Sequence, residues 1–168
     1  SENLAGISTR TKLRLRWYGK ETKAVSAQFE RKNRESSLGS KDTHYLEEPI
    51  DIAGARRSTF VRELRSRLPA FMADALHGYE PVQWIRYDRE YMSSHDGTLR
   101  VTLDRGVSAF DQRTERTITN RKSTPLPQLL IVELKAEENH RESIERCLQG
   151  IDLPPSKCSK FVMASAPD

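Results

Sequence analysis

The sequence predicts an α+β fold in which antiparallel strands form hairpins and helices are inserted between them. Three observations carry this prediction. Residues 12–18 and 98–107 alternate with the period of a strand, apolar residues recur at helical spacing between Ala55 and Leu68, and residues 128–136 form a strand-like run. Because 168 residues fit a single core, we expect one domain over residues 1–168.

The amino-terminal half reads as a hairpin followed by two helices. Residues 12–18 are followed by a polar turn and by a second extended segment at residues 24–34. The serine-rich residues 35–42 break the pattern, as a hairpin end or a loop would. An amphipathic helix then runs up to Pro69, and a second short helix is stopped by Gly78.

The carboxyl-terminal half returns to strands. Residues 82–92 are rich in aromatic and β-branched side chains, and a turn joins them to residues 98–107, so the pair reads as a hairpin. The polar residues 111–124 fit either a loop or an edge strand. The run at 128–136 begins with nearly continuous apolar residues and predicts a strand buried on both faces. A helix follows at residues 140–149.

The composition favours anionic partners. The chain carries 28 lysines and arginines against 24 acidic residues, a net charge of +4, so nucleic acid, phosphate-rich metabolites and anionic membranes are all open. Cys147 and Cys158 form no disulfide framework and no zinc-site spacing, and we therefore expect a reduced, cytoplasmic location. No apolar run approaches the roughly 18 residues of a membrane-spanning helix.

The cations of the first strand occupy alternate positions. Lys12, Arg14 and Arg16 share one face, and Leu13, Leu15 and Trp17 share the other. Two arrangements fit this alternation: a solvated row of charge on an open sheet, or cations that point into a closed barrel and hold an anion. Composition alone does not choose between them.

The charged side chains of the predicted strands, taken together, favour a phosphate ligand. Arg14, Arg16, Lys32, Arg89 and Arg100 outnumber the acids that share their strands, which are Glu30, Asp104 and Glu133. Fork-shaped arginines and mobile lysines suit the oxygens of a triphosphate. Glu133, in an otherwise apolar strand with Lys135, is costly to bury without a partner, and it would suit a divalent cation such as Mg²⁺ or Mn²⁺.

Several short strings resemble one family when taken together and in order. These are RLRWYG, FERK with a following GSK, YDREY, LRVTLD, VELK and SKCSKF. They resemble the VTC domain, the polyphosphate polymerase branch of the triphosphate tunnel metalloenzymes. The resemblance implies an antiparallel β-barrel tunnel with helices packed outside, and an earlier barrel strand that would lie before Ser1. It also implies transfer of the terminal phosphate of ATP to polyphosphate with Mn²⁺ or Mg²⁺.

The resemblance assigns roles to matching positions only. It implies catalytic roles for five residues, of which the last would also bind the metal: Arg14, Arg16, Arg89, Arg100 and Glu133. It implies substrate-binding roles for seven more: Lys32, Lys41, Tyr87, Lys135, Lys157, Ser159 and Lys160.

The expected partners are ATP or triphosphate and polyphosphate, and a membrane-protein partner stays open. Two other functions are also compatible with the same residues. One is a triphosphatase of the tunnel type, and the other is a non-catalytic module that binds polyphosphate or inositol phosphates. Specific nucleic-acid binding is not expected, because the cationic segments lack the interleaved surface aromatics of single-strand binders.

Overall fold

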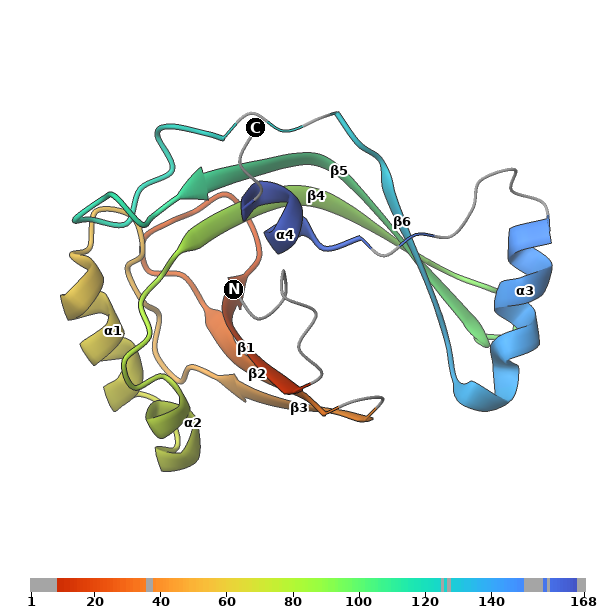
Figure 1. The fold of residues 1–168 in the computed structure, drawn as a ribbon, viewed down its shortest axis with the longest axis horizontal. Coiled ribbons are helices and arrows are strands. Elements are labelled where there is room, and N and C mark those ends of the chain that lie inside the picture. The colour runs from red at the N-terminus through yellow and green to blue at the C-terminus, as the bar shows by residue number, and fades with distance from the viewer. Residues whose placement is uncertain are drawn as a thin grey trace. The chain divides into compact units, whose positions relative to one another are not determined.

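The computed structural model describes residues 9–35, 38–124, 126, 128–149, 156 and 158–165. The elements are, in chain order, β1 (Thr9–Trp17), β2 (Ala27–Glu35), β3 (Leu38–Tyr45), α1 (Arg57–Ser66), α2 (Ala70–Ala75), β4 (Gln83–Ser93), β5 (Leu99–Asp111), β6 (Ile131–Ala136), the 3₁₀ turn η1 (Glu138–His140), α3 (Arg141–Gln149) and α4 (Lys160–Ser165) (Figure 1). Within the described ranges, no helix is long and apolar enough to cross a membrane.

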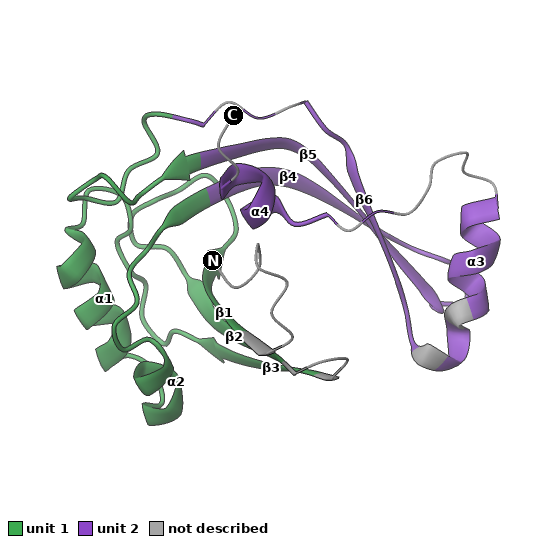
Figure 2. Cartoon of the chain, in the orientation of Figure 1, with its two compact units in different colours: residues 1–84, 110–122 green, residues 85–109, 123–168 purple. Residues whose placement is uncertain are grey.

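The chain divides into two compact units (Figure 2). Unit 1 comprises residues 1–84 and 110–122, and unit 2 comprises residues 85–109 and 123–168. Each unit is built around three strands, in the order β1-β2-β3 in unit 1 and β4-β5-β6 in unit 2. The described elements are thus two small antiparallel sheets and four short helices.

The closed barrel implied by the resemblance is wrong. The strands form two small three-stranded antiparallel sheets instead. A barrel closes only when every strand has a hydrogen-bonded neighbour on both sides, whereas each of these sheets ends in two edge strands. Without a closed barrel, the tunnel that the resemblance implied does not describe this structure either.

The core of unit 1 lies between its sheet and its helices. Phe29 of β2 packs in one cluster with Phe60 and Leu64 of α1 and Met72 of α2, all of them buried. Leu13, Leu15 and Trp17 of β1 pack against this cluster. Burial of this apolar surface is the main force that holds the helices on the sheet. The apolar set of β1 thus faces helices, and its cations lie on the opposite face.

Unit 1 contains one strand that the sequence pattern did not reveal. β3 takes up most of the serine-rich segment that reads as a hairpin end or a loop, and it pairs with β2 from Leu38 opposite Glu35 to Tyr45 opposite Gln28. Its side chains are mainly polar, so it lacks the apolar alternation of a half-buried strand. Pairing with β2 stabilises it instead, including an ion pair between Arg31 and Asp42 at 2.9 Å.

In unit 2, β4 and β5 are neighbours joined by a tight turn, as predicted, and β6 pairs with β5. The expectation that residues 128–136 form a strand buried on both faces is wrong. β6 is an edge strand, and Val132 remains 48% exposed. Its apolar start was read as evidence of burial, but a continuous apolar run does not by itself show which faces are covered. The short helix α4 was not predicted.

Candidate functional site

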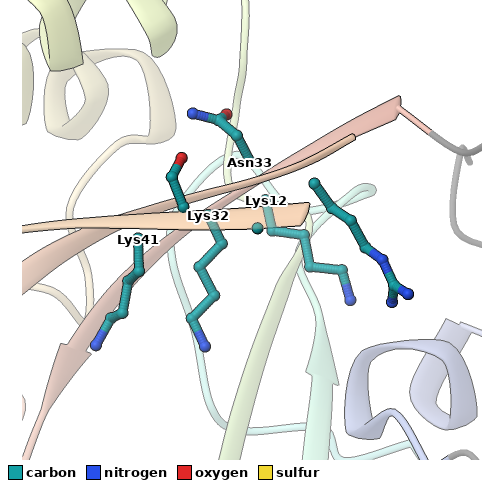
Figure 3. A pocket seen from close by; sticks show the side chains of 7 residues that line it. Lys12, Lys32, Asn33 and Lys41 are labelled. Atoms are coloured by element: carbon teal, nitrogen blue, oxygen red, sulfur yellow. The ribbon is translucent and has the colours of Figure 1, made fainter. Parts of the chain in front are cut away.

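Three lysines lie side by side across the sheet of unit 1. Lys12 of β1 is directly opposite Lys32 of β2, and Lys32 is directly opposite Lys41 of β3. All three side chains extend to the same side of the sheet (Figure 3). Like charges that face each other across strands destabilise a sheet. The row therefore presents three positive charges on one side of the sheet, an arrangement that suits a multiply charged anion.

A groove of about 460 Å³ lies along this row. Its walls consist of residues from all three strands: Lys12, Lys32, Asn33, Arg34, Gly39, Ser40 and Lys41. Arg34 shares the face of the lysines, since it lies two positions from Lys32 along β2. The groove is thus rich in positive charge and lined by four cationic side chains.

The next row along the strands contains a buried carboxylate. Glu30 lies opposite Arg14, and only 1% of its side chain is exposed. It accepts hydrogen bonds from Nε of Arg14 at 2.9 Å and from Nε2 of Gln28 at 3.1 Å, and Nζ of Lys41 lies 2.8 Å from Oε1. Burial alone would raise the pKa of Glu30, but hydrogen bonds from Lys41 and Arg14, together with their charges, lower it to about 2. Glu30 therefore holds two cations in fixed positions.

Arg16 continues the same face. It lies opposite Gln28, and its guanidinium carbon is 4.7 Å from the centre of the Tyr18 ring. Of the predicted site residues, unit 1 thus brings Arg14, Arg16, Lys32 and Lys41 onto one face of one sheet.

Unit 2 contains a second cluster around a buried aspartate. Asp104 of β5 is fully buried and accepts two parallel hydrogen bonds from Arg89 of β4, at 2.5 Å from Nε and 2.7 Å from Nη2. Lys160, at the start of α4, forms an ion pair with the same carboxylate. The Arg89 guanidinium and the Lys160 ammonium both lie against the ring of Tyr87, at 5.1 Å and 4.8 Å from its centre.

These contacts fix the charge states of the cluster. Burial by itself would raise the pKa of Asp104, but the hydrogen bonds from Arg89 and Lys160 outweigh it and lower that pKa. The hydrogen bond to Asp104 in turn raises the pKa of Arg89 above its ordinary value. Asp104 and Arg89 therefore stay ionised near neutral pH, and charge-assisted hydrogen bonds hold the geometry of the cluster.

Glu133 is the accessible carboxylate of unit 2. Its side chain is 43% exposed, and Oε1 lies 3.1 Å from Nζ of Lys135. Nη2 of Arg89 lies 3.9 Å from Oε2, which links Glu133 to the Asp104 cluster. Arg100 is directly opposite Lys135, so these cations also share a face. Unit 2 thus places Tyr87, Arg89, Lys160, Arg100, Lys135 and Glu133 in one sheet and its adjoining helix.

One buried hydroxyl beside Glu133 lacks a partner. Thr102 lies directly opposite Glu133, and its Oγ1 atom makes no hydrogen bond within the described part of the chain. A carboxylate with a neighbouring hydroxyl offers the oxygen ligands that Mg²⁺ and Mn²⁺ prefer. The described residues contain no group of three metal-ligating side chains of the His, Cys, Asp and Glu types. These donors therefore fit an ion that takes its remaining ligands from phosphate and water.

Two predicted residues do not add to either cluster. Ser159 lies immediately before α4, where its carbonyl oxygen accepts a hydrogen bond from the Met163 backbone nitrogen at 3.0 Å, a contact that stabilises the helix. Lys157 lies outside the described residues.

Sequence reasoning missed Lys12, Glu30 and Asp104 as site residues. In the sequence, all three are charged residues at positions that share a strand face with the predicted cations. The acids were treated only as a count against the cations, whereas their burial beneath pairs of cations is a property of the fold.

Each unit therefore presents a sheet face on which several cations are positioned by one buried carboxylate, as expected of a protein that binds multiply charged phosphate compounds. The family model of the VTC domain matches residues 1–167, and the chain belongs to this family. Membership indicates a polyphosphate-related function within a family of phosphotransfer enzymes. No curated protein and no solved structure matches the chain.

Proposed function

We propose that this protein is a polyphosphate polymerase, which transfers the terminal phosphate of ATP to a growing polyphosphate chain. The observation that carries the proposal is the row of Lys12, Lys32 and Lys41 across one sheet, next to the pair of Arg14 and Glu30. Phosphate oxygens that lie among the lysines are attracted by all three positive charges. Membership of the VTC domain family supports polyphosphate as the anion.

In this reaction the protein mainly positions the two substrates and stabilises the charge of the transferred phosphoryl group. A terminal oxygen of the polyphosphate attacks the γ-phosphorus of ATP, the bond from that phosphorus to the β–γ bridging oxygen breaks, and ADP leaves. Fixed cations stabilise the charge on the transferred group because they need no reorganisation during the reaction. In each unit a buried carboxylate provides that fixation: Glu30 for Arg14 and Lys41, and Asp104 for Arg89 and Lys160.

Mg²⁺ or Mn²⁺ is part of the proposal. When it is bound, the ion neutralises part of the negative charge on adjacent phosphate oxygens. Glu133, with the hydroxyl of Thr102 opposite it, would hold the ion. Arg89 and Lys135 lie beside Glu133 and keep its carboxylate oriented before the nucleotide arrives.

The decisive experiment incubates the full chain with ATP and Mn²⁺ and resolves the products by length. We expect phosphate chains that lengthen with time, and loss of that synthesis in Lys32→Gln. Lys20→Gln makes the same chemical change at an exposed turn and serves as the control. Release of free phosphate alone would show a triphosphatase instead, and tight binding of tripolyphosphate without turnover would show a binding module. Either result would contradict the polymerase assignment.

A further inference from the structure

Unit 1 contains a second cavity that the site described above does not use. It has a volume of about 570 Å³ and lies between the loop that joins β1 to β2, residues 53–54 and the segment that follows β5. The polar and charged residues of its wall include Lys23, Thr117, Thr119, Asn120, Arg121 and Lys122. Its volume is in the range of cavities that hold small-molecule ligands.

Three cations line this cavity, and their side chains form no ion pair within the described ranges of the chain. Among the residues that the structure describes, Lys23, Arg121 and Lys122 form no side-chain ion pair, although Glu115 also lines the cavity. Other arginines of unit 1 are paired: Arg57 with Glu80, Arg67 with Glu63 and Arg113 with Asp111. Three cations against one carboxylate leave the cavity with surplus positive charge.

The walls of the cavity are held by backbone hydrogen bonds. Gly54 donates to the carbonyl oxygen of Ile118 at 2.8 Å, and Ile118 donates to that of Ala55 at 2.9 Å. The side chain of Gln112, which is 1% exposed, forms two hydrogen bonds with the backbone of Thr119. Its Oε1 accepts from the Thr119 backbone nitrogen at 2.9 Å, and its Nε2 donates to the Thr119 carbonyl oxygen at 2.7 Å. Hydroxyl and amide groups are therefore presented by a fixed frame.

This cavity is distinct from the lysine groove. The groove includes Lys12, five positions before the end of β1 at Trp17, whereas Lys23 comes after that end. At about 3.4 Å per residue, the strand alone accounts for about 17 Å between the lysine row and the end of β1. No residue lines both cavities.

We propose that this cavity binds a small anion that carries two or more phosphoryl groups. Arg121 offers a planar fork for two oxygens of one phosphoryl group, while Lys23 and Lys122 act as mobile point charges for another. Thr117 and Thr119 add hydroxyl donors and Asn120 an amide. Glu115 repels anions, so the ligand must carry enough negative charge to outweigh this carboxylate, and two phosphoryl groups can contact all three cations at once. The ligand is either an inorganic oligophosphate or a phosphorylated metabolite.

The test titrates the full chain with tripolyphosphate and, separately, with a sugar bisphosphate, and follows backbone amide resonances. We expect the amides of Gly54, Thr119 and Asn120 to shift with one of the two probes, which identifies the source. In Arg121→Gln with Lys122→Gln, the affinity at these amides should fall roughly tenfold. Arg62→Gln with Arg146→Gln removes the same net charge from exposed positions that do not line the cavity, and should leave the affinity nearly unchanged.

Two results would overturn the proposal: neither probe shifts these amides, or the control pair weakens binding as much as the cavity pair. The experiment is independent of the polymerase proposal. Lys32→Gln should abolish synthesis and leave the Gly54 and Thr119 shifts intact, so failure of one proposal does not imply failure of the other.

Discussion

Arg89 and Asp104 are joined by two parallel hydrogen bonds, with Nε donating to Oδ1 and Nη2 donating to Oδ2. The aspartate is fully buried, and 16% of the arginine side chain is exposed. A bidentate pair of this kind fixes the plane of the guanidinium as well as its position. Because Lys160 binds the same carboxylate, one buried aspartate sets the places of two cations from two different elements, β4 and α4.

Removing the charge of Asp104 should be strongly destabilising. Asp104→Asn removes the negative charge that Arg89 and Lys160 share, and loss of one partner of a buried pair costs about 3 kcal/mol. The free energy of unfolding, measured by urea denaturation at neutral pH, should fall by about this amount. Asp111→Asn is the matched control, since it breaks an aspartate–arginine pair in which both side chains are largely exposed, and it should cost less than about 1 kcal/mol. Equal losses in the two variants would show that burial of Asp104 does not govern the stability of the pair.

The sequence predicted the faces of the unit 1 strands because their physical cause is local. In β1 the side chains alternate with period two, and Leu13, Leu15 and Trp17 pack against the helix cluster as the alternation requires. Closure of a barrel is not local. It depends on which strands pair at the edges of each sheet. Neither the hydropathy nor the charge of a strand such as β6 shows which strand it will pair with. The barrel was therefore an inference from resemblance, and the two sheets contradict it.

The same distinction applies to the candidate site. The sequence shows the cations because charge and parity are visible in it, whereas only the strand register shows that Lys32 lies opposite Lys41. The buried carboxylates were not recognised as positioning residues, because the burial of Glu30 follows from the packing around its strand. β3 was hidden for a related reason: its polar side chains carry no apolar period, and its strand conformation comes from pairing with β2.

Stability should depend on pH through Glu30. The pKa of Glu30 is lowered from 4.5 to about 2 in the folded protein, because hydrogen bonds and charges from Lys41 and Arg14 outweigh its burial. A lowered folded-state pKa stabilises the protein above the unfolded pKa, and this contribution is lost as pH falls from about 4.5 towards 2. At about 1.4 kcal/mol per pKa unit, the contribution is of the order of 3 kcal/mol.

Glu30→Gln should therefore be less stable than the native protein at pH 7, and the difference in free energy of unfolding should shrink as pH falls from 4.5 towards 2. Urea denaturation across this range measures both curves. Glu63→Gln, whose side chain is 39% exposed in its ion pair with Arg67 against 1% for Glu30, is the control and should show a smaller difference at every pH. A stability difference for Glu30→Gln that does not change with pH would assign its effect to packing and not to charge.

Lys12 should contribute to phosphate binding although sequence reasoning did not place it in the site. It lies opposite Lys32 and lines the same groove. Lys12→Gln should weaken tripolyphosphate binding by about 0.5–1 kcal/mol, a factor of about two to five, as measured by calorimetry at low salt. Raising the ionic strength should reduce the difference, because exposed charges are screened. Lys20→Gln should bind like the native protein, and a Lys12 variant that also does so would limit the anion site to Lys32 and Lys41.

Glu133 and Thr102 should together determine the metal requirement. Glu133→Gln removes the only full negative charge of this pair, so turnover with Mn²⁺ should be lost while tripolyphosphate still binds in the absence of metal. Thr102→Val keeps the shape of the side chain and removes its unpartnered hydroxyl. This variant should need several-fold more Mn²⁺ for half-maximal synthesis, with no loss of stability, because no hydrogen bond within the described residues is broken.

Glu90→Gln, which breaks an exposed ion pair with Arg105 between β4 and β5, is the control for both variants. Binding of Mn²⁺ in the presence of ATP, followed by electron paramagnetic resonance, separates metal affinity from chemistry. Unchanged Mn²⁺ affinity in Glu133→Gln would remove this carboxylate from the metal site, since no other described carboxylate of unit 2 lies opposite a buried hydroxyl that lacks a partner.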